Sequence, residues 1–125
     1  MNYTITIEHE LRIIRYTHSG LIKEADIGEV WKHLLAMKEF TQLNYNLFSD
    51  YRNGQLQIPV SFLQELIDFM RTIESIVKGK KQALVLDDPR NVAVSMLFED
   101  KVNKEIGFNV KIFTTEASAL RWLAI

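Results

Sequence analysis

The sequence predicts an α/β domain with a mixed sheet of about five strands, in which the first strand is antiparallel and the rest are mainly parallel. Three observations lead to this prediction. Residues 3–8 alternate strictly between apolar and polar side chains, as a strand with one wetter face does. Residues 82–86, Gln-Ala-Leu-Val-Leu, suit a central strand covered on both faces. Strand and helix patterns then alternate to the end of the chain, which implies parallel pairing through right-handed crossovers.

The first two strands are expected to form a hairpin. A second β-rich run covers residues 11–17, and only His9 and Glu10 separate it from the first run. So short a link favours antiparallel pairing through a loose turn. His18-Ser19-Gly20 ends the second strand, and helical spacing of apolar residues predicts a helix over about residues 23–38.

The middle of the chain predicts a strand, a long connection and a long helix. The strand covers residues 45–49, and the polar stretch of residues 50–59 is the longest connection. Ser61 and Gln64 fit a capping box at the start of the helix. Apolar residues keep the helical period from Phe62 to Val77, and Gly79 ends the helix.

After the strand at residues 82–86, Asp88 and Pro89 indicate an N-cap and the first position of a helix. This helix runs to about Ile106, and Gly107 ends it. Its weaker apolar side is expected to consist of Val92, Ala93, Met96, Leu97 and Val102.

Residues 108–113 alternate as a last strand, and Thr114 or Thr115 caps the last helix. The inward side chains of that helix are expected to be Ala117, Leu120, Leu123 and Trp122. The predicted order is therefore β-β-α-β-α-β-α-β-α. A chain of 125 residues can bury one core but not two, so residues 1–125 are expected to form a single domain.

Composition argues against several classes of function. Fifteen basic and 16 acidic residues leave a net charge of −1, so there is no basic excess for nucleic acid or an anionic membrane. No apolar run approaches the roughly 20 residues that span a bilayer. The five glycines form neither GxGxxG nor a P-loop, so no dinucleotide or other cofactor is expected.

The chain has no cysteine, which excludes disulfides, thiolate catalysis and cysteine-ligated metal sites. This composition is compatible with a reducing compartment. The first residues, Met1-Asn2-Tyr3-Thr4, lack the basic-then-apolar form of a signal peptide. We therefore expect a cytoplasmic protein.

A candidate ligand edge lies where the strands end, because ligands of open α/β sheets gather beyond the carboxyl ends of the strands. Four segments are predicted to meet there, and Thr114-Thr115 is one of them. The candidate ligand residues of the other three are His18, Asp50, Tyr51, Arg52, Asp87, Asp88 and Arg90. The alternative is that these residues are polar only because the chain turns at that edge.

An enzymatic alternative uses Asp50, Asp87 and Asp88 as an acidic pocket for magnesium, in a small metal-dependent or phosphoryl-handling enzyme. It requires the three carboxylates to converge. Each also has a plain explanation, since Asp88 caps a helix, Asp87 ends a strand and Asp50 can be held by Arg52. No catalytic triad or metal-ligand motif is recognisable, so no catalytic or metal residue is assigned.

Two further features bear on regulation and partners. Ser61 at a helix start is a candidate phosphorylation site, although the sequence favours a plain N-cap, which needs no further role. Phe98 falls outside the thin apolar stripe of its helix and is expected to be an exposed anchor. An anchor of this kind, or a patch near residues 50–59, would serve a protein partner or a homodimer.

The order of elements and two stretches of sequence resemble a known superfamily. One stretch is Phe48-Ser49-Asp50-Tyr51-Arg52, a strand ending in Asp-x-Arg. The other is Val110-Lys111-Ile112-Phe113-Thr114-Thr115-Glu116-Ala117, followed by Leu120-Arg121-Trp122-Leu123. Together they resemble the SpoIIAA-like (STAS-like) proteins, in particular an uncharacterised bacterial branch.

The resemblance implies a SpoIIAA-like fold and a small regulatory or binding domain rather than an enzyme. Anti-sigma-factor antagonists of that superfamily carry Asp-Ser-Ser-Gly, with the phosphorylated serine inside it, at the start of the helix after the third strand. Here that region reads Ile58-Pro59-Val60-Ser61-Phe62-Leu63, with one serine and neither the acidic neighbour nor the glycine. The resemblance therefore carries over the fold but not the phospho-switch.

Overall fold

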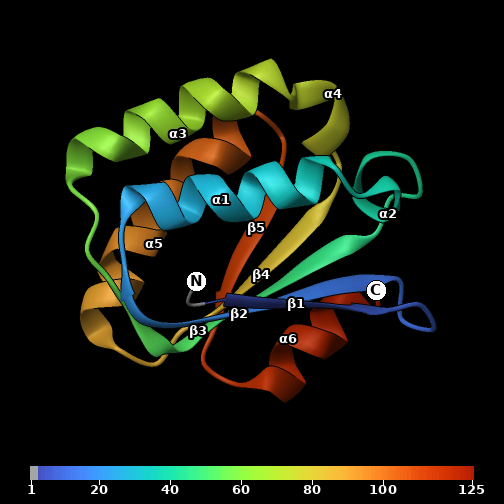
Figure 1. Ribbon diagram of the computed structural model, residues 1–125, viewed down its shortest axis with the longest axis horizontal. Helices are drawn as coiled ribbons and strands as arrows, with labels where there is room; N and C mark the ends of the chain where they lie inside the picture. The colour runs from blue at the N-terminus through green and yellow to red at the C-terminus, as the bar shows by residue number, and fades with distance from the viewer. Residues whose placement is uncertain (1–2) are drawn as a thin grey trace.

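The computed structural model describes residues 3–125, and this part of the chain forms one five-stranded sheet with helices on both faces (Figure 1). The strands are β1 (Tyr3–Glu8), β2 (Ile13–Ile22), β3 (Asn46–Leu56), β4 (Lys81–Val85) and β5 (Asn109–Phe113). The helices are α1 (Glu24–Leu35), α2 (Lys38–Thr41), α3 (Val60–Thr72), α4 (Glu74–Val77), α5 (Pro89–Glu105) and α6 (Glu116–Leu123).

The strands lie in chain order across the sheet, β1-β2-β3-β4-β5. β1 pairs antiparallel with β2, whereas β2–β3, β3–β4 and β4–β5 are parallel. Each parallel pair is joined through a helical crossover, as parallel pairing requires. The predicted fold class, with an antiparallel first strand and a parallel remainder, is confirmed.

The helices divide unequally between the two faces of the sheet. Figure 1 shows α1, α3 and α5 on one face, which we call the three-helix face, and α6 on the opposite α6 face. The larger core cluster fills the three-helix face and includes Ile14, Leu47 and Ile67. The smaller cluster under α6 includes Phe48 and Leu123. Because strand side chains alternate, each strand residue is assigned to one face or the other by its parity.

β2 and β3 are longer than predicted, and the expected connection of residues 50–59 is wrong for its first seven residues. The two strands pair to Ile22 and Leu56, with an irregularity in the register between Thr17 and Ser19. Asn53 and Gln55 are exposed in this extension, so its polarity suggested a loop. The backbone is nevertheless paired as in any strand.

The extension of β3 depends on Gly54 and on an asparagine from α5. A Cβ atom at Gly54 would lie 2.5 Å from the Ile22 Cδ1 atom. The close packing of β2 against β3 at this point therefore depends on the missing side chain of Gly54. β4 pairs with β3 only as far as Asp50. Beyond that point the Asn91 side chain accepts from the Leu56 N–H and donates to the Gly54 carbonyl, both at 3.0 Å.

Helix ends that depend on local chemistry agree with the sequence. The Asp88 side chain caps α5 by accepting from the Arg90 N–H at 2.8 Å, and Thr115 caps α6. Gly79 and Gly107 follow helices with φ of 84° and 80°. The Ser61 cap is wrong, because α3 begins after Pro59 and has no side-chain cap.

One helix is shorter than expected and another is interrupted. α1 ends at Leu35, before the predicted end near residue 38, and α2 follows as a separate turn. The helix expected to reach Gly79 breaks at Ile73 into α3 and α4. Ile73 is itself buried in the core, and the chain bends there towards β4.

The buried face of α5 differs from the prediction. Phe98 is buried at 8% exposure, so the expectation of an exposed anchor is wrong. The residues that turn inward are Asn91, Ser95, Phe98 and Val102. Met96 and Leu97, expected to face inward, are instead exposed. Two of these inward positions, Asn91 and Ser95, are polar, so the spacing of apolar residues did not predict the buried face.

α6 follows its prediction in part. Leu123 is buried as expected, together with Ala119, whereas Ala117 is exposed. Trp122 is half-buried and its ring packs against Phe113, with centroids 5.5 Å apart. Within residues 3–125, no helix is both long enough and apolar enough to cross a membrane.

Candidate functional site

The candidate ligand residues do not share one edge of the sheet. His18, Asp50, Tyr51 and Arg52 lie within β2 and β3 rather than beyond their ends, because both strands run further than predicted. Strand alternation then separates them: His18 and Tyr51 lie on the three-helix face, and Asp50 and Arg52 on the α6 face. Of the candidate set, Asp87, Asp88 and Arg90 follow a strand end, that of β4.

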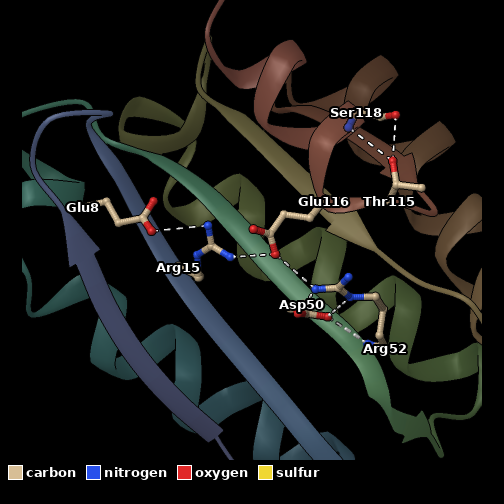
Figure 2. Close-up of polar contacts among 7 residues, drawn as sticks. All are labelled: Glu8, Arg15, Asp50, Arg52, Thr115, Glu116 and Ser118. Carbon is tan, nitrogen blue, oxygen red and sulfur yellow. Dashed lines mark hydrogen bonds and ion pairs between the residues drawn. The ribbon is translucent and has the colours of Figure 1, made fainter.

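On the α6 face, five charged side chains form an ion-pair row, which we define as Glu8, Arg15, Glu116, Arg52 and Asp50. Figure 2 shows them in this order across β1, β2, α6 and β3. The successive N–O distances are 3.3, 3.1, 3.3 and 2.7 Å. Glu116 therefore bridges two arginines from different strands and anchors the start of α6 to the sheet.

The pair at the end of the row is the tightest. Arg52 donates to Asp50 through its Nε and NH2 groups at 2.9 and 2.7 Å, and through its backbone N–H at 3.1 Å. Partial burial would raise the pKa of Asp50, but the Arg52 hydrogen bonds outweigh it and hold that pKa below its usual value. The same hydrogen bonds raise the pKa of Arg52. The Asp50 carboxylate and the Arg52 guanidinium therefore neutralise each other's charge and hydrogen-bond to each other.

On the three-helix face, a buried polar cluster lies inside the core. We define it as Tyr16, Ser49, Tyr51 and Gln82, which come from β2, β3 and β4 and are each at most 6% exposed. The Gln82 Nε2 group donates to the Tyr16 hydroxyl at 2.8 Å and to the Ser49 hydroxyl at 2.9 Å. The Tyr16 and Tyr51 hydroxyls lie 3.3 Å apart.

One polar atom of this cluster has no partner. The Gln82 Oε1 atom is buried and receives no hydrogen bond within the described part of the chain. A buried carbonyl without a donor costs about 1–3 kcal/mol. Burial also raises the pKa of Tyr16 and Tyr51, so both phenols remain neutral donors at neutral pH.

His18 lies beside the cluster and is fully buried. Its ring packs against Tyr3, Tyr16 and Tyr51, with centroids 5.3, 6.0 and 5.5 Å away. Neither ring nitrogen has a hydrogen-bond partner among residues 3–125. Burial lowers the pKa of His18, and the charge of Asp26 offsets only part of this effect. The imidazole is therefore neutral at pH 7.

Two adjacent hollows lie on the three-helix face, and one of them is lined by the buried polar cluster. A cavity of about 50 Å³ is lined by Tyr16, Tyr51 and Gln82 at its floor and by side chains of α1, α3 and α5. A groove of about 350 Å³ runs between α1 and α3, with a mainly apolar lining that includes Gly28 and Phe69. Ile27, Trp31 and Leu66 line both hollows, so the groove and the cavity are adjacent.

The turn between β4 and α5 holds the remaining candidates. Asp88 accepts from the Arg90 backbone and pairs with its guanidinium at 3.3 Å, and these hydrogen bonds lower the pKa of Asp88. Asp87 is exposed. Within residues 3–125, no three His, Asp or Glu side chains are arranged to hold a metal ion. Asp50 and Asp88 each pair with the arginine two residues later, so the acidic pocket does not assemble from them.

Ser61 lies at the second residue of α3 and its side chain is exposed. This position is accessible to a kinase, and phosphorylation there stays a prediction.

Most residues that build the two polar sites were not among the sequence candidates: Tyr16, Ser49 and Gln82 of the cluster, and Glu8, Arg15 and Glu116 of the row. Gln82 could have been noticed in the sequence, because it is the polar residue of the otherwise apolar run of residues 82–86.

Comparison with known proteins identifies the fold. No family model matches the sequence, and no curated protein matches it. Among solved structures, the chain is similar to an uncharacterised protein of the DUF3478 family from Shewanella loihica, described as having a SpoIIAA-like fold. The two share 13% sequence identity with a TM-score of 0.65, over 98% of this chain and 94% of that one. The expected resemblance is confirmed at the level of structure: the chain has a SpoIIAA-like fold.

Proposed function

We propose that this protein is a small non-enzymatic binding domain, whose ligand is a mainly apolar molecule with one hydrogen-bond donor. Its apolar part occupies the groove between α1 and α3, and its donor reaches the Gln82 carbonyl. The observation that carries the proposal is the buried Gln82 Oε1 atom, which has no hydrogen-bond partner among residues 3–125 and lies at a cavity adjacent to an apolar groove.

The size and lining of the hollow support such a ligand. Small-molecule sites are mostly apolar clefts of about 300–1,000 Å³ with a few placed polar groups, and the groove of about 350 Å³ lies at the lower end of that range. A donor delivered to Gln82 would recover the cost of burying its carbonyl. A charged ligand group would be disfavoured, because the cluster is neutral and deeply buried.

The state of the other polar residues favours binding over catalysis. The carboxylates of Asp50 and Asp88 are held by arginines, and His18 is enclosed by aromatic rings. A general acid or base must reach the substrate proton within hydrogen-bond distance. We place the domain in the cytoplasm, in line with a cysteine-free sequence.

The test compares two probe molecules that differ in one donor, 4-butylphenol and 4-butylanisole. Calorimetry should show that wild-type protein binds the phenol about fivefold to tenfold more tightly, as one net hydrogen bond of about 1 kcal/mol implies. Gln82→Met keeps the volume and removes the amide, so it should abolish this preference. If wild-type protein binds the phenol and the anisole with equal affinity, or if Gln82→Met keeps the preference for the phenol, Gln82 does not bind the donor.

A second variant tests the groove itself. Gly28 lines the groove, and a Cβ atom there would meet nothing within 4 Å. Gly28→Leu should therefore fill the groove without disturbing the core, and both probes should lose binding. Gly28→Ala is the matched control and should bind normally. If Gly28→Leu binds both probes as tightly as wild type, the ligand does not occupy this groove.

A further inference from the structure

The two edge strands of the sheet, β5 and β1, differ in whether side chains cover their outer backbone groups. The outer backbone groups of β5 are hydrogen-bonded to side chains of α5. Asn103 accepts from the Val110 N–H at 3.1 Å and donates to the Val110 carbonyl at 2.9 Å. Glu99 accepts from the Ile112 N–H at 3.0 Å. These side chains take the place of a neighbouring strand, which blocks pairing with another chain.

A third α5 side chain does the same for β3. Asn91 binds the Gly54 carbonyl and the Leu56 N–H where β4 no longer accompanies β3. Strand edges in this protein are therefore covered in two places by side chains of one helix. Covering of this kind is a known way of protecting an edge from further strands.

β1 forms the opposite edge and has no such cover. It pairs with β2 on one side, and within residues 3–125 no side chain or loop hydrogen-bonds to its outward backbone groups. Its sequence, Tyr-Thr-Ile-Thr-Ile-Glu, contains no lysine, proline or glycine. β-Branched residues favour the strand conformation, and charges or prolines that would discourage pairing are missing before Glu8.

We propose that β1 pairs antiparallel with β1 of a second copy of this chain, which joins two sheets into one across a two-fold axis. The sequence of β1 is self-complementary when the axis passes beside Ile5. Ile5 then faces Ile5, Tyr3 faces Ile7, and Thr4 faces Thr6. Every facing pair lies on one face of the sheet, as antiparallel pairing requires.

The composition of this pairing is favourable. Aromatic with β-branched pairs and threonine pairs are among the stabilising cross-strand contacts. Tyr3, Ile5 and Ile7 are half-buried on the three-helix face, whereas Thr4 and Thr6 are exposed on the other face. The five residues from Tyr3 to Ile7 carry no charge, so two copies meet without repulsion.

Sedimentation velocity over a range of concentrations tests the proposal. Wild-type protein should be a dimer, and the double variant Thr4→Lys/Thr6→Lys should be a monomer with unchanged circular dichroism, because each lysine faces a lysine of the partner. The matched control is Asn53→Lys/Gln55→Lys, which adds the same charges at exposed positions of β3, a strand that is not at the β1 edge of the sheet. It should remain a dimer. Wild-type protein that stays monomeric at millimolar concentration, or a dimer unaffected by the β1 lysines, would overturn the proposal.

Cross-linking tests the register independently of stability, because the chain has no cysteine of its own. Facing residues of an antiparallel pair have Cα atoms about 4.5–5.5 Å apart, within the range that a disulfide spans. Ile5→Cys should therefore form a covalent dimer on mild oxidation. Ser118→Cys, on α6, should not. Failure of Ile5→Cys to cross-link in a preparation that is dimeric would show that another surface forms the dimer.

Discussion

At the scale of single residues, the surroundings of His18 show how burial changes a side chain's role. The sequence suggested a ligand residue at a strand end, and the structure encloses it among three tyrosine rings. Burial favours the neutral imidazole, because the enclosed ring has no hydrogen-bond partner within the described part of the chain to stabilise its charge. The folded protein therefore resists protonation of His18 more than the unfolded chain does.

This difference predicts how stability depends on pH. The folded pKa of His18 lies below its unfolded value of about 6.5, so the unfolded state binds more protons as the pH falls below about 6.5. The free energy of unfolding should therefore decrease as the pH falls from 7 through 6.5 towards the folded pKa, and then level off. Denaturant unfolding measured from pH 7.5 to 5 checks this.

The variant His18→Phe should lose this pH dependence, and His33→Gln, at an exposed position, is its control. Asp50 and Asp88 act in a different range. Their pKa values are lowered on folding, so the stability that they contribute is lost only under more acidic conditions, as the pH falls through their folded pKa values. A wild-type profile that is flat between pH 7 and 5 would contradict the buried neutral state of His18.

Two glycines give opposite predictions for the same substitution. Gly54→Ala places a Cβ atom 2.5 Å from the Cδ1 atom of buried Ile22 and 3.2 Å from the His18 backbone carbonyl oxygen, so it should destabilise by about 1–3 kcal/mol. Gly28→Ala in α1 meets nothing within 4 Å and should stabilise by about 0.5–1 kcal/mol through helix propensity. Thermal denaturation of both variants checks this. Equal melting temperatures would refute the close approach of β2 and β3 at Gly54.

At the scale of elements, α5 both packs against the sheet and hydrogen-bonds to strand edges, and residues for the two roles alternate along its sequence. Phe98 and Val102 bury it against the sheet, while Asn91 and Asn103 hydrogen-bond to strand edges. The buried Asn91 and Ser95 interrupt the apolar stripe, which is why hydrophobic spacing alone predicted a rotated face. The amphipathic pattern of α5 is weak because polar positions also contact the sheet.

The cover of the β5 edge can be removed by one substitution. Asn103→Ala deletes two hydrogen bonds to Val110 and should destabilise by about 1–3 kcal/mol, at 0.5–1.5 kcal/mol for each bond. The unpaired edge should also exchange its amide hydrogens faster, at Val110 first. Hydrogen exchange followed by NMR measures this. Asn109→Ala, at an exposed β5 position, should change neither quantity.

At the scale of the whole molecule, α6 is attached to the sheet by both charge and apolar packing. The ion-pair row links Glu116 to β2 and β3, and Leu123 packs beneath with Ala119 and Phe48. Partly exposed ion pairs contribute about 0–1 kcal/mol, whereas a buried leucine contributes several times more. The apolar contact therefore dominates the attachment.

This comparison gives a prediction with two arms. Glu116→Gln should lower the free energy of unfolding by at most about 1 kcal/mol, and less at high salt. Leu123→Ala should lower it by about 2–5 kcal/mol at any salt concentration. Urea denaturation at low and high sodium chloride measures both. A larger loss for Glu116→Gln than for Leu123→Ala would show that the ion-pair row carries the attachment.

The sequence alone determined the features that depend on neighbouring residues. The alternation of Tyr3–Glu8, the Asp88 cap before Pro89 and the stops at Gly79 and Gly107 are local in the chain, and all four agree with the structure. The order of strands and helices then restricted the topology, because crossovers are short and of one hand. The fold class could therefore be predicted, together with the antiparallel first strand.

Only the tertiary structure decided the sites. Arg52 meets Glu116, 64 residues away, and Gln82 meets Tyr16, 66 residues away. The parity of β3 sends Asp50 and Tyr51 to opposite faces, and the length of β3 depends on Gly54 and Asn91. These contacts join segments that only the packed sheet brings together, so no local pattern in the chain encodes them. Two features of residues 3–125, the Gln82 carbonyl without a partner and the uncovered edge of β1, become visible only in the assembled sheet.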